Sequence, residues 1–226
     1  MRHIIKKYWG KHRSKALLKQ EAMLKIALLE IGVSPEWVKI EVDHLNGMCL
    51  INKIPMNVIF PRVYFDIIEP KDIDKRKNDF YFNGYKGGDG GRERLMKPFE
   101  KKGGLVIYSE NGRRKENKGQ FNKDYMVEMS DSKYSLCPHQ LDWPHKSSTI
   151  WTYRFIEACI AFSIPVVFEQ TPLSKEFIGG FRYVTDRMVL SEKLNFDNED
   201  VKHNWKLARE RHTISEKIEE DIWRSI

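Results

Sequence analysis

The chain has 226 residues, of which 41% are apolar and 12% aromatic, so it can bury one sizeable core and is not a disordered protein. Its 39 Lys and Arg outnumber its 32 Asp and Glu; the net charge of +7 favours an anionic partner, although a plain basic surface explains it too. The polar start, the lack of a long apolar run and three cysteines without a CxxC pair predict a soluble cytoplasmic protein with no membrane span.

The first 70 residues predict a small N-terminal lobe. Apolar residues recur with helical periodicity over residues 15–31, and Gly32 is suited to end that helix. Pro35 marks a turn or a helix start in front of a strand. Prolines among the apolar residues of 50–68 favour edge strands or extended loops there.

From about residue 71 the chain alternates between predicted strands and helices. The run 164–168 is continuously apolar, which is typical of a parallel strand that is buried on both faces. The alternation predicts an α/β fold with a Rossmann-like parallel sheet and C-terminal helices in residues 71–226. The predicted strands occupy 79–84, 105–110, 133–138, 164–168 and 182–185, and the predicted helices 92–102, 125–129, 147–162 and 200–223.

The helix predicted at 147–162 carries the residues with the clearest chemistry. Ser148 and Thr152 place hydroxyl donors near a helix N-terminus, which itself attracts anions. Arg154 can deliver a planar cation to a phosphate, and Glu157 lies on the same helical face and can accept both hydroxyls of a ribose. This arrangement suits a nucleoside diphosphate, although an ordinary surface ion pair between Arg154 and Glu157 explains the same spacing.

Three short motifs in this region resemble those of the exostosin-like glycosyltransferases. The first contains Ser132, Lys133, Leu136, Cys137 and Pro138, the second Thr152, Arg154, Glu157 and Ala158, and the third Ile164, Pro165, Val166 and Val167. The upstream segment 79–95 is similar to the strand–glycine–arginine block of that family. The resemblance covers roughly residues 71–190.

The resemblance implies a GT-B-like nucleotide-sugar domain. It further implies inverting sugar transfer from a UDP-linked donor to a glycan or glycoconjugate acceptor, with no metal and no other cofactor. Arg154 would contact the donor diphosphate and Glu157 the donor ribose. A full GT-B acceptor domain is usually larger than residues 1–70, so this small N-terminal lobe would be either a reduced acceptor side or unrelated to one.

The chain departs from the family pattern at two places. The Cys-Pro turn ends at Pro138, which we retain as a binding residue, but the Arg-Gly that should follow is missing. His139, Lys146 or Arg92 could replace that phosphate contact. Phe162 and Ser163 stand where the family has Gly-Cys, so the packing at this position must differ.

The glycine-rich loop 84–91, which starts at Gly84, could let backbone N–H groups approach a phosphate. It matches neither a Walker A motif nor GxGxxG, and a plain surface loop has the same composition. Arg92 and Arg94 follow the loop, and we favour Arg92 as the arginine that faces the site.

Inverting transfer requires a base that deprotonates the acceptor hydroxyl. Asp43 and His44 form a compact candidate pair in the N-terminal lobe, and Glu41 and Asp66 are alternatives. A lone Asp-His pair is also common on ordinary polar surfaces.

No metal site is expected from the sequence. The seven histidines are scattered without ligand spacing. Asp72 and Asp74 match the pattern D-x-D, but they precede the first strand of the domain that carries the motifs.

Two other functions remain open. The basic strip 97–118, with Tyr108 and Phe121, could grip nucleic acid, but this does not explain the combination of Arg154, Glu157 and a buried strand. Nucleic acid is therefore the less favoured partner. The short N-terminal segment also allows a donor-binding lobe that needs a partner chain.

Overall fold

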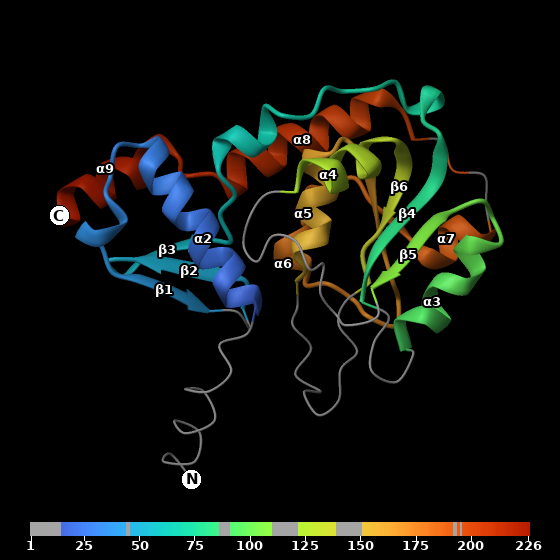
Figure 1. The fold of residues 1–226 in the computed structure, drawn as a ribbon, viewed down its shortest axis with the longest axis horizontal. Coiled ribbons are helices and arrows are strands. Elements are labelled where there is room, and N and C mark those ends of the chain that lie inside the picture. Colours follow the sequence, from blue (N-terminus) through green and yellow to red (C-terminus); the bar gives the residue numbers. More distant parts are fainter. Residues whose placement is uncertain are drawn as a thin grey trace, which may run out of the picture.

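The structure of the chain is a computed structural model that describes residues 15–43, 46–85, 91–109, 122–138, 151–191, 194 and 196–226. These residues form two lobes that lie side by side (Figure 1). The smaller lobe contains an antiparallel sheet, and the larger lobe contains a parallel sheet flanked by helices.

In the smaller lobe, helix α2 (Lys15–Glu30) packs against a sheet in the order β1-β2-β3. Gly32 follows α2 with a φ of +75°, as expected of the glycine that ends a helix. The remaining elements are the 3-10 helix η1 (Pro35–Trp37) and the strands β1 (Ile40–Asp43), β2 (Met48–Ile51) and β3 (Ile54–Asn57).

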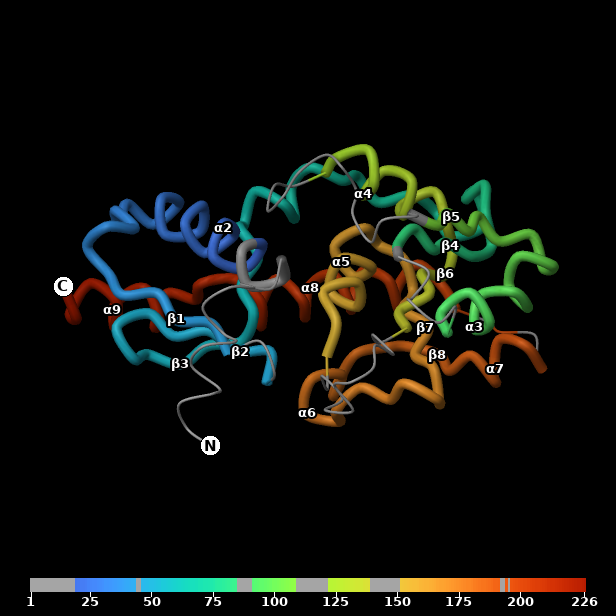
Figure 2. The backbone as a smooth tube through the Cα atoms, turned by 60° about the horizontal axis from the view of Figure 1, so that its bottom comes forward, coloured from blue at the N-terminus to red at the C-terminus, as the bar shows by residue number. Residues whose placement is uncertain are grey.

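The C-terminal helix α9 (Glu216–Ser225) lies against this smaller lobe (Figure 2). Ile214 and Ile222 belong to the same hydrophobic cluster as Leu24 and Leu28 of α2. The sequence predicts that residues 71–226 form the second domain. In the structure, α9, at the end of that segment, packs against the first.

The larger lobe has a five-stranded sheet in the order β5-β4-β6-β7-β8, with every neighbouring pair parallel. The predicted α/β class is therefore confirmed, and the sheet is consistent with a Rossmann-like fold. In such sheets the strand order reverses at one point, here between β4 and β6, and ligands bind beyond the carboxyl ends there. The strands are β4 (Asn78–Tyr85), β5 (Leu105–Ser109), β6 (Ser132–Leu136), β7 (Ile164–Val167) and β8 (Val184–Thr185).

The terminal helical region divides into α8 and α9 because Thr213 is extended and the Ser215 hydroxyl accepts a hydrogen bond from the Ile218 N–H. The helices α6 and α7 and the 3-10 helices η2 and η3 were not predicted. The helices are α3 (Gly91–Glu100), α4 (Lys123–Ser130), α5 (Tyr153–Ile160), α6 (Lys175–Ile178), α7 (Asp186–Ser191) and α8 (Asn198–His212), with η2 (Arg62–Phe65) and η3 (Ile73–Lys75).

Phe162 occupies a position where the resemblance predicts glycine, and its packing explains why a larger residue fits there. It lies two residues before β7, whose four residues are all buried, and has a φ of +55°, a conformation that is unfavourable for L residues. Its ring stacks on Trp205 of α8, with centroids 5.6 Å apart and planes within 8° of parallel. The stacking offsets the backbone strain, so an aromatic side chain is tolerated at a glycine position.

We expect Phe162→Gly to be less destabilising than Phe162→Ala. Both variants lose the buried ring, at a cost of roughly 3–5 kcal/mol, but glycine also relieves the left-handed strain, which is worth about 1 kcal/mol. Urea unfolding of the two variants measures the difference. An alanine variant as stable as the glycine variant, or more stable, would show that position 162 stores no strain.

His212, at the end of α8, is buried at the junction of the two lobes. Its Nδ1 donates a hydrogen bond to the Val58 carbonyl at 2.9 Å, and its ring faces Phe177 and Phe181. Burial lowers the pKa of His212 to about 4. The imidazole is therefore neutral in the folded protein at neutral pH.

Because the folded pKa lies below the ordinary value of about 6.5, the unfolded chain binds the extra proton first as the pH falls. The contribution of His212 to stability should be intact above pH 6.5 and should fall by about 3 kcal/mol as the pH drops through 4. His212→Asn keeps an N–H donor but cannot titrate. Chemical unfolding between pH 4 and 7.5 should therefore show a smaller decline for this variant, and equal declines would contradict the assignment.

Candidate functional site

Helix α5 lies where the two lobes meet (Figures 1 and 2) and carries Arg154 and Glu157. The helix begins at Tyr153 with Thr152 as its N-cap residue, so it is shorter than predicted. The Thr152 side chain makes no capping hydrogen bond. Arg154 is thus the second helical residue, close to the first backbone N–H groups of α5.

The guanidinium of Arg154 reaches the carboxyl end of β4, at the point where the strand order reverses. Its Nη2 donates to the backbone carbonyl of Asn83 at 2.8 Å, and its Cζ lies 4.5 Å from the centre of the Phe82 ring. Its Nε is buried and has no hydrogen-bond partner among the described residues. The cation is therefore positioned by a carbonyl and an aromatic face, and part of its donor capacity is unused.

Burial lowers the pKa of Arg154, but Tyr125, Cys137 and Glu157 together outweigh that effect, and the pKa lies above its usual value. The guanidinium is therefore charged at every physiological pH. A permanent cation at this edge of the sheet suits an anionic ligand.

Gly84 makes room for this guanidinium. A Cβ at this position would lie 2.5 Å from Nη2 of Arg154, closer than non-bonded atoms can approach. The sequence assigned Gly84 to direct backbone contact with a phosphate, and the structure places the arginine against it. This supplies a physical reason for glycine at the end of β4.

Glu157 has partners from two other elements. The phenol of Tyr125 in α4 donates to Oε2 at 3.1 Å, and the ammonium of Lys19 in α2 pairs with Oε1. Lys19 is 138 residues away in the sequence, and no motif singled it out. Glu157 therefore connects both lobes.

The smaller lobe also contacts the start of α5 through Trp151. Gly47, in the turn between β1 and β2, has a φ of +65°, and a Cβ there would lie 2.7 Å from the Trp151 ring. Asp43 begins this turn and accepts hydrogen bonds from the backbone N–H and the side-chain amide of Asn46. The structure thus places Gly47, four residues after the predicted base Asp43, against Trp151, which precedes Arg154.

The other predicted residues fall into three groups. Pro138 is buried two residues after the end of β6, and Arg92 is half-buried at the second position of α3, beyond β4. Glu41 and Asp66 pair with Lys39 and Arg209. His44, His139, Lys146, Ser148 and Phe121 lie outside the described residues, as do residues 110–118 of the basic strip.

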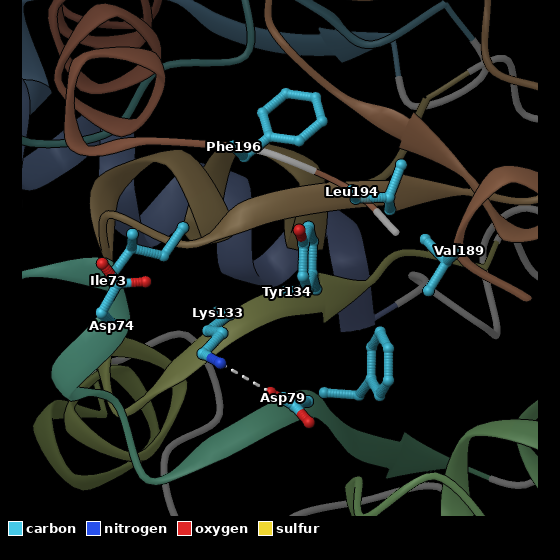
Figure 3. A pocket seen from close by; sticks show the side chains of 9 residues that line it. Ile73, Asp74, Asp79, Lys133, Tyr134, Val189, Leu194 and Phe196 are labelled. Carbon is cyan, nitrogen blue, oxygen red and sulfur yellow. Dashed lines mark ion pairs between the residues drawn. The ribbon is translucent and has the colours of Figure 1, made fainter. Parts of the chain in front are cut away.

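A pocket of about 230 Å³ lies at the opposite, amino end of β4 and β6 (Figure 3). The ion pair between Asp79 and Lys133, at 2.9 Å, crosses one wall, and Phe80 and Tyr134 form part of the lining. It contains none of the predicted binding residues, and its charged pair is self-neutralising. We therefore do not assign the anion site to it.

Asp74 also lines this pocket, whereas Asp72 pairs with Lys75 at 2.6 Å. The hydrogen bond from Lys75 lowers the pKa of Asp72. The D-x-D pair thus lies at the amino side of the sheet, away from Arg154. Among the described residues, no group of three His, Cys, Asp or Glu side chains is arranged to hold a metal ion.

No protein-family model matches the chain, and no curated protein sequence matches it. Among the helices that the structure describes, none is both long and apolar enough to cross a membrane.

The contact between Gly84 and Arg154 predicts a coupled pair of mutations. Gly84→Ala should destabilise the protein by roughly 1–3 kcal/mol, because the new methyl group displaces the guanidinium. In an Arg154→Ala background the same change should cost at least 1 kcal/mol less. Urea unfolding of the four proteins measures this coupling, and additive effects would mean that the guanidinium does not lie over Gly84.

Proposed function

We propose that the chain is a nucleotide-sugar-dependent glycosyltransferase of the GT-B type. It transfers the sugar of a UDP-linked donor to a glycan or glycoconjugate acceptor, with inversion and without a metal. One observation carries the proposal: a permanently charged guanidinium, whose buried Nε has no hydrogen-bond partner among the described residues, lies at the carboxyl edge of β4, one helical turn from a carboxylate. The resemblance of the surrounding motifs supports the same conclusion.

Arg154 and the N-terminus of α5 bind the donor diphosphate. The guanidinium offers charge-assisted hydrogen bonds, and the first N–H groups of α5 add backbone donors. Because Asn83 and Phe82 already hold the side chain, little further ordering is needed when the ligand arrives. Glu157 accepts the two hydroxyls of the donor ribose.

Asp43 is the base. It removes the proton from the acceptor hydroxyl while that oxygen attacks the anomeric carbon and the bond to the diphosphate breaks. Arg154 stabilises the negative charge that develops on the departing nucleoside diphosphate. The packing of Gly47, four residues after Asp43, on Trp151, two residues before α5, supports this assignment.

Nucleic-acid binding is less well supported. Glu157 places a carboxylate beside the arginine, and this would repel a phosphate backbone. Tyr108, which the sequence offered for base stacking, donates its hydroxyl to Glu100 at 2.7 Å and tilts against Phe82. The aromatic ring is therefore already engaged within the protein.

Arg154→Ala should weaken UDP binding by about ten- to a hundredfold, since a hydrogen bond to a charged group contributes roughly 1.5–3 kcal/mol. Calorimetric titration with UDP measures the affinity. Arg224→Ala removes an exposed arginine of α9 and serves as the charge-matched control. If both variants bound UDP as tightly as the wild type, Arg154 would not belong to a donor site.

A further inference from the structure

The carboxylate of Glu157 is already engaged in the structure, although the proposed function requires it for the donor ribose. Lys19 pairs with Oε1 and Tyr125 donates to Oε2. Only 12% of the Glu157 side chain is exposed. A ribose diol therefore cannot reach this carboxylate until one of the two partners moves.

The two partners differ in how easily they can move. Tyr125 is 4% exposed and packs against the ring of Tyr81, with centroids 5.8 Å apart. The Lys19 side chain is 30% exposed, and it is held by Glu157 and by the face of the Tyr153 ring, 4.7 Å from its Nζ. A long, partly solvated lysine is therefore the group that yields.

We propose that the Lys19–Glu157 ion pair is a latch that covers the ribose site of the free protein and is released by the donor. This inference rests on the proposed function, because it assumes that Glu157 receives a ribose diol. The nucleotide competes with Lys19 for the same carboxylate oxygen, so part of its binding free energy is used to break the pair. Lys19 belongs to the smaller lobe, so occupation of the donor site also releases a contact between the lobes.

The latch predicts that removal of the lysine charge tightens nucleotide binding. Lys19→Met keeps the length of the apolar stem but cannot pair with Glu157. Its affinity for UDP should rise by about fivefold, which corresponds to the roughly 1 kcal/mol of a partly exposed ion pair. Lys25→Met removes an exposed lysine from the same helix and should leave the affinity unchanged or slightly lower.

A second measurement needs no nucleotide. Urea unfolding of the wild type, Lys19→Met, Glu157→Gln and the double variant yields the coupling between the two side chains. The latch requires a favourable coupling free energy between Lys19 and Glu157. The double variant should then be more stable than the summed effects of the two single variants predict. Additive effects would overturn the latch whatever the ligand.

The outcomes separate the latch from the proposed function. Tighter UDP binding by Lys19→Met, with coupling, supports both. If the wild type binds UDP and Lys19→Met binds it equally well or more weakly, the latch is overturned and the donor site stands. Lys19 would then have no effect on nucleotide binding or would itself contact a phosphate. Failure of the wild type and of Lys19→Met to bind UDP overturns the UDP site, and the latch falls with it.

Discussion

A half-buried cation at the carboxyl edge of a parallel sheet sets the requirements for the residues around it. The guanidinium of Arg154 needs a carbonyl, an aromatic face and negative charge nearby, and Asn83, Phe82 and Glu157 meet these needs. It also needs space, which Gly84 provides. The residues that stabilise the guanidinium thus also position it at the point where the strand order reverses.

Both lobes contribute residues to the candidate site. The larger lobe contributes the cation and the first turn of α5, while the smaller lobe contributes the turn after Asp43 and the ammonium of Lys19. The lobes are tied together by buried contacts, including the hydrogen bond between His212 and the Val58 carbonyl. A donor on one lobe and an acceptor on the other would meet at this junction.

Periodicity and turn residues were sufficient to predict the parallel sheet, because local pattern dictates strands such as β7. The candidate cation and carboxylate could also be predicted, since Arg154 and Glu157 are close in sequence. Contacts between distant segments could not be predicted. Nothing local marks Lys19 as the partner of Glu157, or Ile222 of α9 as part of the core of the smaller lobe. The stacking of Phe162 on Trp205 was likewise hidden, because it depends on how α8 crosses β7.

The central claim is that the site binds a nucleoside diphosphate through both its phosphates and its ribose. Calorimetric titration of the wild type and Glu157→Gln, with UDP and with a short oligothymidylate, tests it most directly. A ribose loses a charged acceptor in this variant, whereas a phosphate backbone loses a repulsive charge. The account predicts about a ten- to hundredfold weaker affinity for UDP and an equal or tighter affinity for the oligonucleotide. An unchanged affinity for UDP in Glu157→Gln would contradict it, whatever the variant does to oligonucleotide binding.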